Sequence, residues 1–249
     1  MNYGNKISYH LTLNQAHAII AAADHAFCIG RPLNQFVTIH FNKAGITATH
    51  AFVTAFFKLT GDWLRASTKE PPYYVWVLEN EQNKGLHLHL LVHVPFGRKG
   101  QFKKLANRWL DRLGTNRQAD ALDIRPVRHS CRMQSAKSVS TIWAYLGHWG
   151  GWYQRDGLKG ALGYMLKGLS AVNCVAIGIG HQPQGIVTGK RCGFSEALGP
   201  TWRKRIEATW RQPMPKHPGI TLLGSGLRWR RWLRIVGLCR ETEYRPDVD

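Results

Sequence analysis

Two histidines separated by a single leucine, His87 and His89, have the residue type and the spacing of a metal-binding pair. They lie in the segment LHLHLLVHV, which predicts a β-strand, so both imidazoles project from one face about 6.6 Å apart. At that separation, two imidazoles can converge on a single ion. His93 has the same parity but lies roughly 13 Å further along, and we expect it to be an ordinary hydrogen-bonded histidine near the strand end.

A carboxylate is expected to complete this site, because two imidazoles rarely hold a catalytic ion alone. The preceding segment, YYVWVLE, predicts a strand that pairs antiparallel with the histidine strand through a turn at residues 83–85. That pairing lets Glu79 face His87 or His89, whereas Glu81 has the same parity but sits closer to the turn and is the second choice. Two histidines and one carboxylate suit a divalent ion that polarises a phosphate oxygen. Taken alone, the motif is explained more simply by a solvated strand face.

A tyrosine outside an apolar stripe is the second feature of interest. Residues 158–169 predict a helix whose apolar side chains recur with the spacing of a buried face. Tyr164 lies away from that stripe, and Lys167 follows it one turn later on the same side. An exposed tyrosine with a neighbouring lysine is common on helix surfaces.

The order of these features resembles that of the HUH endonuclease superfamily, most nearly the rolling-circle replication initiators (Rep type). The strand FVTIHF, residues 36–41, is similar to the first motif of that family. His87-Leu88-His89 is similar to the His-hydrophobic-His second motif, and Tyr164 with Lys167 to the third, YxxK. The resemblance covers about residues 34–170, and its order, spacing and predicted elements agree.

Two details refine the resemblance. Many members carry an acidic residue about eight positions before the first histidine, and Glu79 occupies that place. Some initiators have a second tyrosine one turn before the first, but Gly160 stands there, so the resemblance implies a single-tyrosine enzyme. Tyr145 and Tyr153 lack a lysine three positions later and are minor candidates for a second nucleophile.

The resemblance implies a specific reaction. Mg²⁺ or Mn²⁺ is expected on His87, His89 and Glu79, while Tyr164 attacks the scissile phosphate and leaves a 5′-phosphotyrosine and a free 3′-OH. Lys167 is expected to assist the phenol by its charge or to position the phosphate. The implied function is nicking and joining of single-stranded DNA to start rolling-circle replication of a plasmid or phage. The implied partners are single-stranded or hairpin origin DNA, host replication proteins and a second copy of the chain.

Two alternatives remain open at this point. A transposase or a mobilisation relaxase would share the chemistry, and relaxases often use an N-terminal tyrosine, for which Tyr3 and Tyr9 are candidates. The YxxK spacing favours the replication type. A nucleic-acid-binding module without catalysis would predict binding with neither a covalent product nor a metal requirement.

The elements that must position these residues form an α+β pattern. The order β-α-β-β-α-β predicts a ferredoxin-like or RRM-like antiparallel sheet of about five strands, of the HUH type, with helices packed on it. Pro126 indicates that the last predicted strand lies at an edge. The predicted strands are residues 35–41, 73–79, 86–94 and 122–127, and the predicted helices are residues 13–28, 48–66, 99–113 and 158–169.

Three regions are expected along the chain: an N-terminal helical extension at 1–33, the HUH catalytic domain at 34–170 and a basic C-terminal region at 171–249. The last includes Lys190-Arg191, the run 203–205 and the segment LRWRRWLRIVGL. Contact with DNA and ordinary packing of the tryptophans on the catalytic domain explain that segment about equally well, and a membrane-surface role less well.

Composition points to a polyanionic partner. Thirty-four Lys and Arg residues stand against 15 Asp and Glu, a formal net charge of +19, and ten tryptophans and eight tyrosines accompany them. This mixture suits neutralisation of phosphates together with stacking of bases. The five cysteines form no CxxC pair, and no signal-peptide or membrane-spanning segment is recognisable, so we expect the reducing cytoplasm of a bacterial host.

Overall fold

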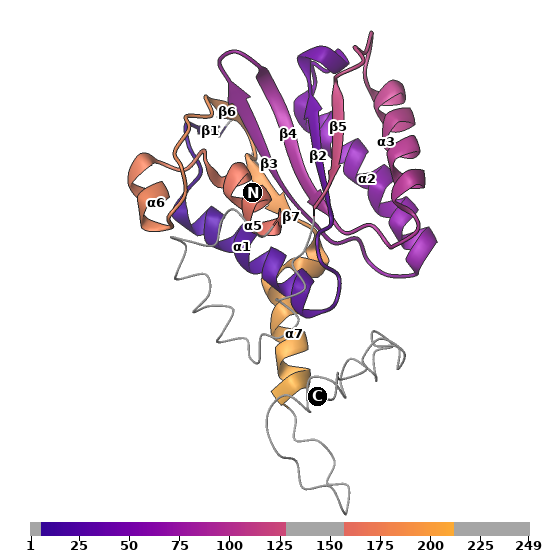
Figure 1. Cartoon of the computed structure of the whole chain (residues 1–249), viewed down its shortest axis with the longest axis vertical. Helices are drawn as coiled ribbons and strands as arrows, with labels where there is room; N and C mark the ends of the chain where they lie inside the picture. Colours follow the sequence, from indigo (N-terminus) through magenta and orange to yellow (C-terminus); the bar gives the residue numbers. More distant parts are fainter. Residues whose placement is uncertain (1–5, 128–156, 212–249) are drawn as a thin grey trace, which may run out of the picture.

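The computed structural model describes residues 6–127 and 157–211, with side chains to residue 205. Within these ranges the chain is α+β, with five antiparallel strands in one central sheet and helices packed against it, as the sequence predicts (Figure 1). The candidates Tyr3, Tyr145 and Tyr153 and the Trp/Arg segment at 227–238 lie outside the described residues.

The predicted helices and strands correspond closely to the observed ones. Three helices begin and end within two residues of their predicted bounds. The fourth, predicted at residues 158–169, ends three residues earlier than expected. The helices are α1 (Leu13–Cys28), α2 (Thr49–Thr68), α3 (Lys99–Leu113), α5 (Gly157–Leu166), α6 (Ala171–Ala176) and α7 (Pro200–Arg211), with 3₁₀ turns η1 (Asn42–Ala44) and η3 (Glu196–Leu198). The strands are β1 (Ile7–Ser8), β2 (Gln35–His40), β3 (Tyr74–Glu81), β4 (Gly85–Val92), β5 (Leu122–Pro126), β6 (Val187–Thr188) and β7 (Cys192–Phe194).

The central sheet has the strand order β5-β2-β4-β3-β7, and every neighbouring pair is antiparallel. β2 and β3 therefore run in the same direction on either side of β4, and α2 connects them. β5 is an edge strand, as the proline at its end predicts. The pairing register sets His87 opposite Glu79 on one side and opposite His40 on the other.

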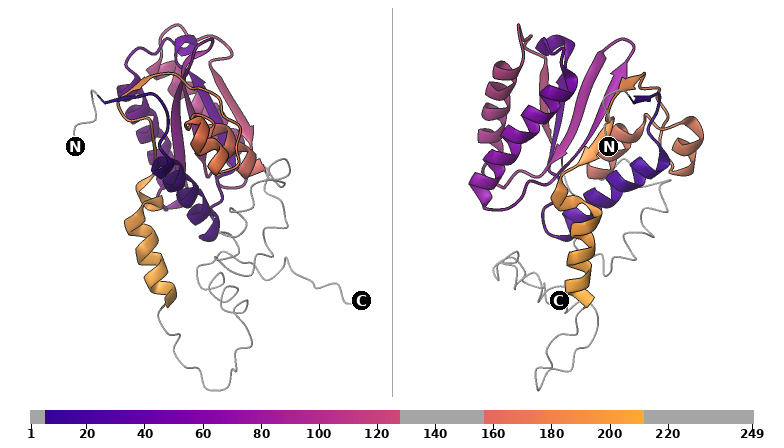
Figure 2. Two further views of the ribbon diagram at one scale, coloured as in Figure 1. Left: turned by 90° about the vertical axis from the view of Figure 1, so that its left-hand side faces the viewer. Right: turned by 180° about the vertical axis from the view of Figure 1, so that it is seen from behind.

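Strand alternation divides the sheet into two faces. Leu88 and Leu90 of β4 point to the face covered by α2 and α3 and are fully buried in a hydrophobic core there. His87 and His89 point to the other face, where α1 and α5 form a second core with Val77 and neighbouring residues. Figures 1 and 2 show these two helical layers on opposite sides of the sheet. The candidate metal ligands His87 and His89 thus lie between the sheet and the helical layer that contains α5.

The folded unit extends beyond the predicted limits of the catalytic domain. α1, in the region expected to be an N-terminal extension, belongs to the same hydrophobic core as α5. β7 lies beyond residue 170 and is the edge strand beside β3. Arg191, expected at a DNA-contacting surface, is 2% exposed and donates hydrogen bonds to the carbonyl oxygens of Ser8, Gln184 and Gly185. This arginine therefore ties the β7 segment to the N-terminal strand.

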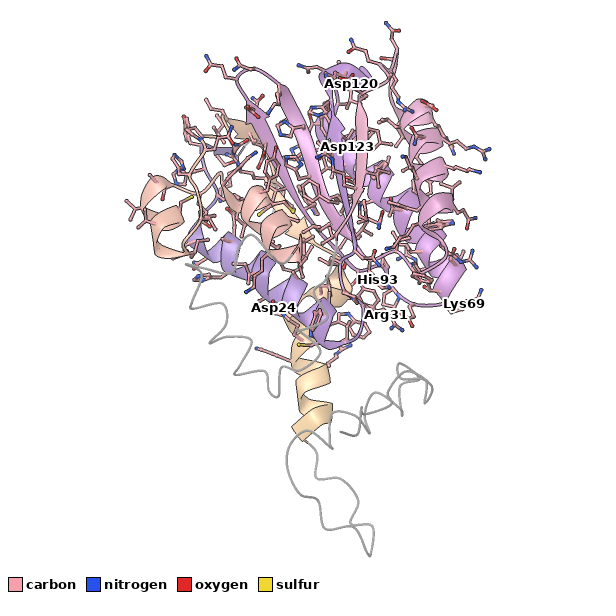
Figure 3. All side chains as sticks on the ribbon, in the orientation of Figure 1. Asp24, Arg31, Lys69, His93, Asp120 and Asp123 are labelled. Carbon is pink, nitrogen blue, oxygen red and sulfur yellow. The ribbon has the colours of Figure 1, made fainter. Side chains whose placement is uncertain are left out.

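Asp24 of α1 gives a prediction about stability and pH (Figure 3). Burial raises the pKa of its carboxyl to about 7, against the opposing charges of Lys159 and Arg203, and its Oδ2 atom has no hydrogen-bond partner among the described residues. The folded state therefore holds the proton more tightly than the unfolded chain, and this group's contribution to stability is lost as pH rises from about 4 to about 7.

We expect Asp24→Asn to melt at a higher temperature than the wild type at pH 8, with a smaller difference at pH 5. Thermal unfolding of both proteins at the two pH values checks this. A temperature difference that does not change with pH would contradict the shifted carboxyl.

Candidate metal centre and nucleophile

Three buried side chains from adjacent strands meet on the α5 side of the sheet. The Oε2 atom of Glu79 on β3 lies 3.2 Å from Nε2 of His87 and 3.1 Å from Nε2 of His89, both on β4. Each of the three residues is 1% exposed. Their ligand atoms all lie within 4.8 Å of one another, so the group can hold a metal ion. Ligands about 2.1 Å from a common ion are about 3 Å apart, which matches these separations.

The hydrogen bond on the far side of His87 supports a cation at this position. His87 Nδ1 lies 2.9 Å from the carbonyl oxygen of Gly85, which can only accept, so Nδ1 carries the proton. In the form of the ring that has no proton on Nε2, this atom carries a lone pair directed at the carboxylate of Glu79. Two lone pairs at that distance repel each other unless a proton or a metal ion lies between them. An imidazole held through Nδ1 by a backbone carbonyl is the usual arrangement of a metal-binding histidine.

His89 is held on its far side by a different partner. Its Nδ1 lies 3.0 Å from the hydroxyl oxygen of Thr38 on the neighbouring strand β2. The Phe36 ring stacks on His89 with a centroid separation of 5.3 Å. Burial lowers the pKa of His89, although the carboxylate of Glu79 acts in the opposite direction. A neutral imidazole in a fixed orientation is the form that binds metal.

Glu79 is ionised in this setting. Burial by itself raises the pKa of a carboxyl, but hydrogen bonds from His87 and His89, with the nearby charge of Lys167, lower the pKa of Glu79 to about 2. Its second oxygen, Oε1, has no hydrogen-bond partner among the described residues. A buried carboxylate with an unpartnered oxygen is costly unless a cation shares the site.

Lys167 differs from its predicted position. The helix α5 ends at Leu166, three residues before the predicted end, so Lys167 lies in the following turn and not on an exposed helix face beside Tyr164. It is 6% exposed, and its Nζ lies 3.4 Å from Glu79 Oε2 and 3.5 Å from the centre of the Tyr164 ring. The lysine therefore bridges the carboxylate and the tyrosine.

Tyr164 combines contact with the triad and access to solvent. Its ring meets the His89 ring edge to face, with centroids 5.1 Å apart, and meets Phe36 in the same way at 6.0 Å. The residue nevertheless remains 43% exposed. Of the residues in this group, Tyr164 is therefore the one most exposed to solvent.

Other candidates from the sequence do not join the triad. Glu81 lies opposite Gly85 and its carboxylate accepts hydrogen bonds from Lys84, which leaves Glu79 as the carboxylate of the group. Tyr9 follows β1, which pairs with β6 outside the central sheet.

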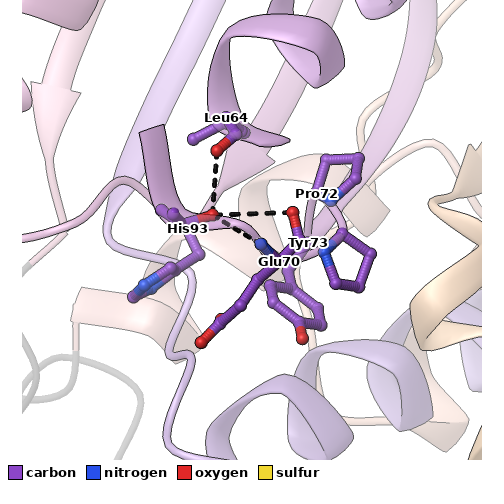
Figure 4. Close-up of a pocket in the computed structure, with 7 residues that line it drawn as sticks. Leu64, Glu70, Pro72, Tyr73 and His93 are labelled. Atoms are coloured by element: carbon purple, nitrogen blue, oxygen red, sulfur yellow. Dashed lines mark hydrogen bonds between the residues drawn. The ribbon is translucent and has the colours of Figure 1, made fainter. Parts of the chain in front are cut away.

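His93 lies beyond the end of β4 and, as predicted, makes an ordinary hydrogen bond near the strand end. Its Nδ1 donates to the carbonyl oxygen of Pro32 at 2.8 Å. The imidazole also lines a small pocket with Glu70, Pro72 and Tyr73 (Figure 4). This pocket belongs to the end of the sheet that is remote from the triad.

Two further residues of β2 border the site and are not among the predicted functional residues. Thr38 holds His89, as described above, and the His40 ring lies 5.4 Å from the His87 ring. Burial lowers the pKa of His40, and the positive charges around it act in the same direction. The sequence could have indicated both residues. Thr38 and His40 alternate with apolar residues in the strand FVTIHF, so they lie on the same face as Phe36.

Among the described residues, no helix combines the length and the apolar composition needed to cross a membrane. No protein-family model, curated protein or solved structure matches this chain.

Proposed function

We propose that this protein is a metal-assisted nuclease and strand transferase that attacks single-stranded DNA with Tyr164. The observation that carries the proposal is the packing of a solvent-accessible phenol against a buried Glu79/His87/His89 group. A structural role alone explains these residues poorly, because a core gains little from two imidazoles, a carboxylate and an ammonium group that share one buried position.

The arrangement of the sheet supports an HUH-type fold. β2, β3, β4 and β5 with the crossover helices α2 and α3 follow the order β-α-β-β-α-β, and β4 is inserted between the parallel strands β2 and β3. This order is similar to the split βαβ arrangement of ferredoxin-like domains. The second and third motifs of the resemblance lie on β4 and at the end of α5, on the same face of that sheet.

The residues divide the chemistry among them. Glu79, His87 and His89 would hold a divalent ion, Mg²⁺ or Mn²⁺, which would polarise a phosphate oxygen and stabilise charge on it. Tyr164 Oη attacks the phosphorus, and its proton passes to solvent. The bond from phosphorus to the 3′ oxygen breaks, and that oxygen takes a proton to give a 3′-OH. The product on the protein is a 5′-phosphotyrosine.

Lys167 acts on this step through its charge. Its Nζ lies 3.5 Å from the centre of the Tyr164 ring, where it attracts the negative charge that develops on the phenol oxygen and the phosphate. The ion pair with Glu79 holds the ammonium group in place before the substrate arrives. The covalent ester conserves the energy of the broken bond, so a second 3′-OH can reverse the step and join strands.

The spacing of Tyr164 and Lys167 supports a particular biological setting. That spacing is similar to the YxxK motif of replication initiators, so we place the reaction at the start of rolling-circle replication of a plasmid or phage. Origin DNA in single-stranded or hairpin form is the substrate, because a phosphate must enter a site that is open on one side.

The test is the formation and mapping of a covalent adduct. We expect the wild-type protein, incubated with Mn²⁺ and a labelled pool of randomised single-stranded oligonucleotides, to give a denaturant-stable adduct that EDTA prevents. Mass spectrometry of the digested adduct should place the nucleotide on the peptide that contains Tyr164. Labelled duplex of the same length serves as the control substrate. An adduct on another residue, or none with any divalent ion, contradicts the proposal.

A further inference from the structure

The outer surface of α3 is a strip of uncompensated positive charge. We define the α3 strip by its six cationic residues, Arg98, Lys99, Lys103, Lys104, Arg108 and Arg112. Five of them are exposed, and Lys99 is half-buried. None of the six forms an ion pair with a described residue, and the single acidic residue of the helix, Asp111, is paired with Arg117.

Charge repulsion within the strip has an energetic cost. Lys104, Arg108 and Arg112 follow one another at intervals of four residues, so they stand in a row on the outer face. Like charges at this spacing destabilise a helix. The opposite face of α3 offsets this cost, since Phe102, Ala106 and Leu110 are fully buried. The row is thus a feature that the fold accommodates and does not need.

We propose that the α3 strip binds the sugar-phosphate backbone of double-stranded DNA. The fifteen residues of the helix span about 22 Å, which corresponds to roughly six base pairs of duplex. The aromatic residues of the helix, Phe102 and Trp109, are buried, so its exposed face offers no platform on which successive unpaired bases would stack. Phosphate contacts from a row of lysines and arginines fit a duplex backbone instead.

A membrane surface is a poorer fit to the same charges. A helix that lies on a lipid surface inserts its apolar face, but the apolar face of α3 is occupied. Phe102 is fully buried and Trp109 is 9% exposed, and both pack against Trp63 of α2. One apolar side chain, Phe96, is 97% exposed in the loop before α3, and a single phenylalanine is a small anchor.

The position of the strip separates it from the nuclease site. α3 covers the face of the sheet that bears Leu88 and Leu90, whereas the triad and Tyr164 lie on the opposite face (Figure 1). Duplex binding by α3 therefore requires neither a metal ion nor the tyrosine. The inference stands even if the nuclease assignment fails, and its test is run in EDTA.

The experiment is a salt titration of binding to a short labelled DNA duplex by the full chain. We expect the variant Lys104→Gln/Arg108→Gln/Arg112→Gln to reduce the slope of log K against log salt concentration by about 2.7, if each side chain neutralises one phosphate. If the two proteins bind equally at 1 M salt, this slope difference makes the affinity of the variant roughly 170-fold lower than that of the wild type at 0.15 M salt. Glutamine is a good helix former, so the melting temperature should be unchanged or slightly higher.

The matched control is Lys6→Gln/Lys58→Gln/Lys69→Gln, which removes three exposed charges outside α3 and outside the basic C-terminal region. We expect its slope to change by less than half as much as that of the α3 variant. Equal changes in the two variants would overturn the proposal, because net charge and not the strip would then set the affinity. Vesicles of phosphatidylserine and phosphatidylcholine test the lipid alternative. If the α3 variant loses binding to these vesicles but binds the duplex like the wild type, the strip binds a lipid surface and the proposal is wrong.

Discussion

Replacing Tyr164 with phenylalanine is expected to abolish the covalent DNA adduct, with a loss of several orders of magnitude. Phenylalanine keeps the ring contacts with His89 and Phe36 and the position of Lys167 over the ring. It removes only the phenol oxygen, which is the proposed nucleophile. The effect should therefore appear in the amount of adduct per unit time, while the melting temperature and its response to Mn²⁺ stay at the wild-type values.

Tyr9→Phe is the matched control for this substitution. Tyr9 is 67% exposed and precedes α1, away from the strands that carry the triad, so its variant should form the adduct at the wild-type rate. An adduct that persists in Tyr164→Phe would remove the nucleophile from the proposal. Tyr145→Phe and Tyr153→Phe would then identify whether a tyrosine outside the described residues carries the nucleotide.

The second large effect is expected from Glu79→Gln, in both stability and metal binding. Glu79 and Lys167 are buried and form an ion pair at 3.4 Å, so removal of the carboxylate leaves an ammonium group in the core without its partner. Breaking a buried pair in this way costs about 3–5 kcal/mol. Denaturant unfolding of the metal-free protein measures this loss directly.

A paired variant separates the effect on folding from the effect on metal. Glu79→Gln/Lys167→Met removes both charges, and we expect it to recover most of the lost stability in EDTA. Mn²⁺ at 100 times its dissociation constant should stabilise the wild type by about 2.7 kcal/mol but should leave the paired variant unchanged. Stabilisation of both proteins by Mn²⁺ would place the metal elsewhere, and an undiminished stability of Glu79→Gln would rule out the ion pair as a structural element.

Glu81→Gln is the control variant, because it removes a different carboxylate from the same strand. Its partner Lys84 is half-exposed, and surface pairs of this kind contribute about 0–1 kcal/mol. We therefore expect a small change in stability and a wild-type response to Mn²⁺. A variant that loses the metal response would move the third ligand from Glu79 to Glu81.

Much of the fold and part of the site follow from the sequence, because both depend on short-range rules. Period-two alternation puts His87 and His89 on one face, and the short turn at residues 83–85 sets the hairpin register that brings Glu79 opposite His87. Helical periodicity gives the bounds of α1 and α3 to the residue. These features need no information about the rest of the chain.

The short strand β7 shows where local rules fail. The strand has only three residues, with Gly193 at its centre, so it shows no alternation that would predict it. Its pairing with β3 joins residues more than 110 positions apart in the chain. The sequence does not predict the burial of Arg191 either, because a Lys-Arg pair usually indicates a solvated surface. Its burial is stabilised by carbonyl oxygens that only the folded chain brings together.

The sequence alone determined the ligand types, their common face and the presence of a tyrosine followed by a lysine. The tertiary structure decided that α5 ends at Leu166, that Lys167 turns inward to Glu79 and that the Tyr164 ring lies against His89. The reason is that a strand or helix pattern fixes the direction of a side chain relative to its own element. The distance between side chains of different elements is set by how the helical layer packs on the sheet, and that packing is a property of the whole core.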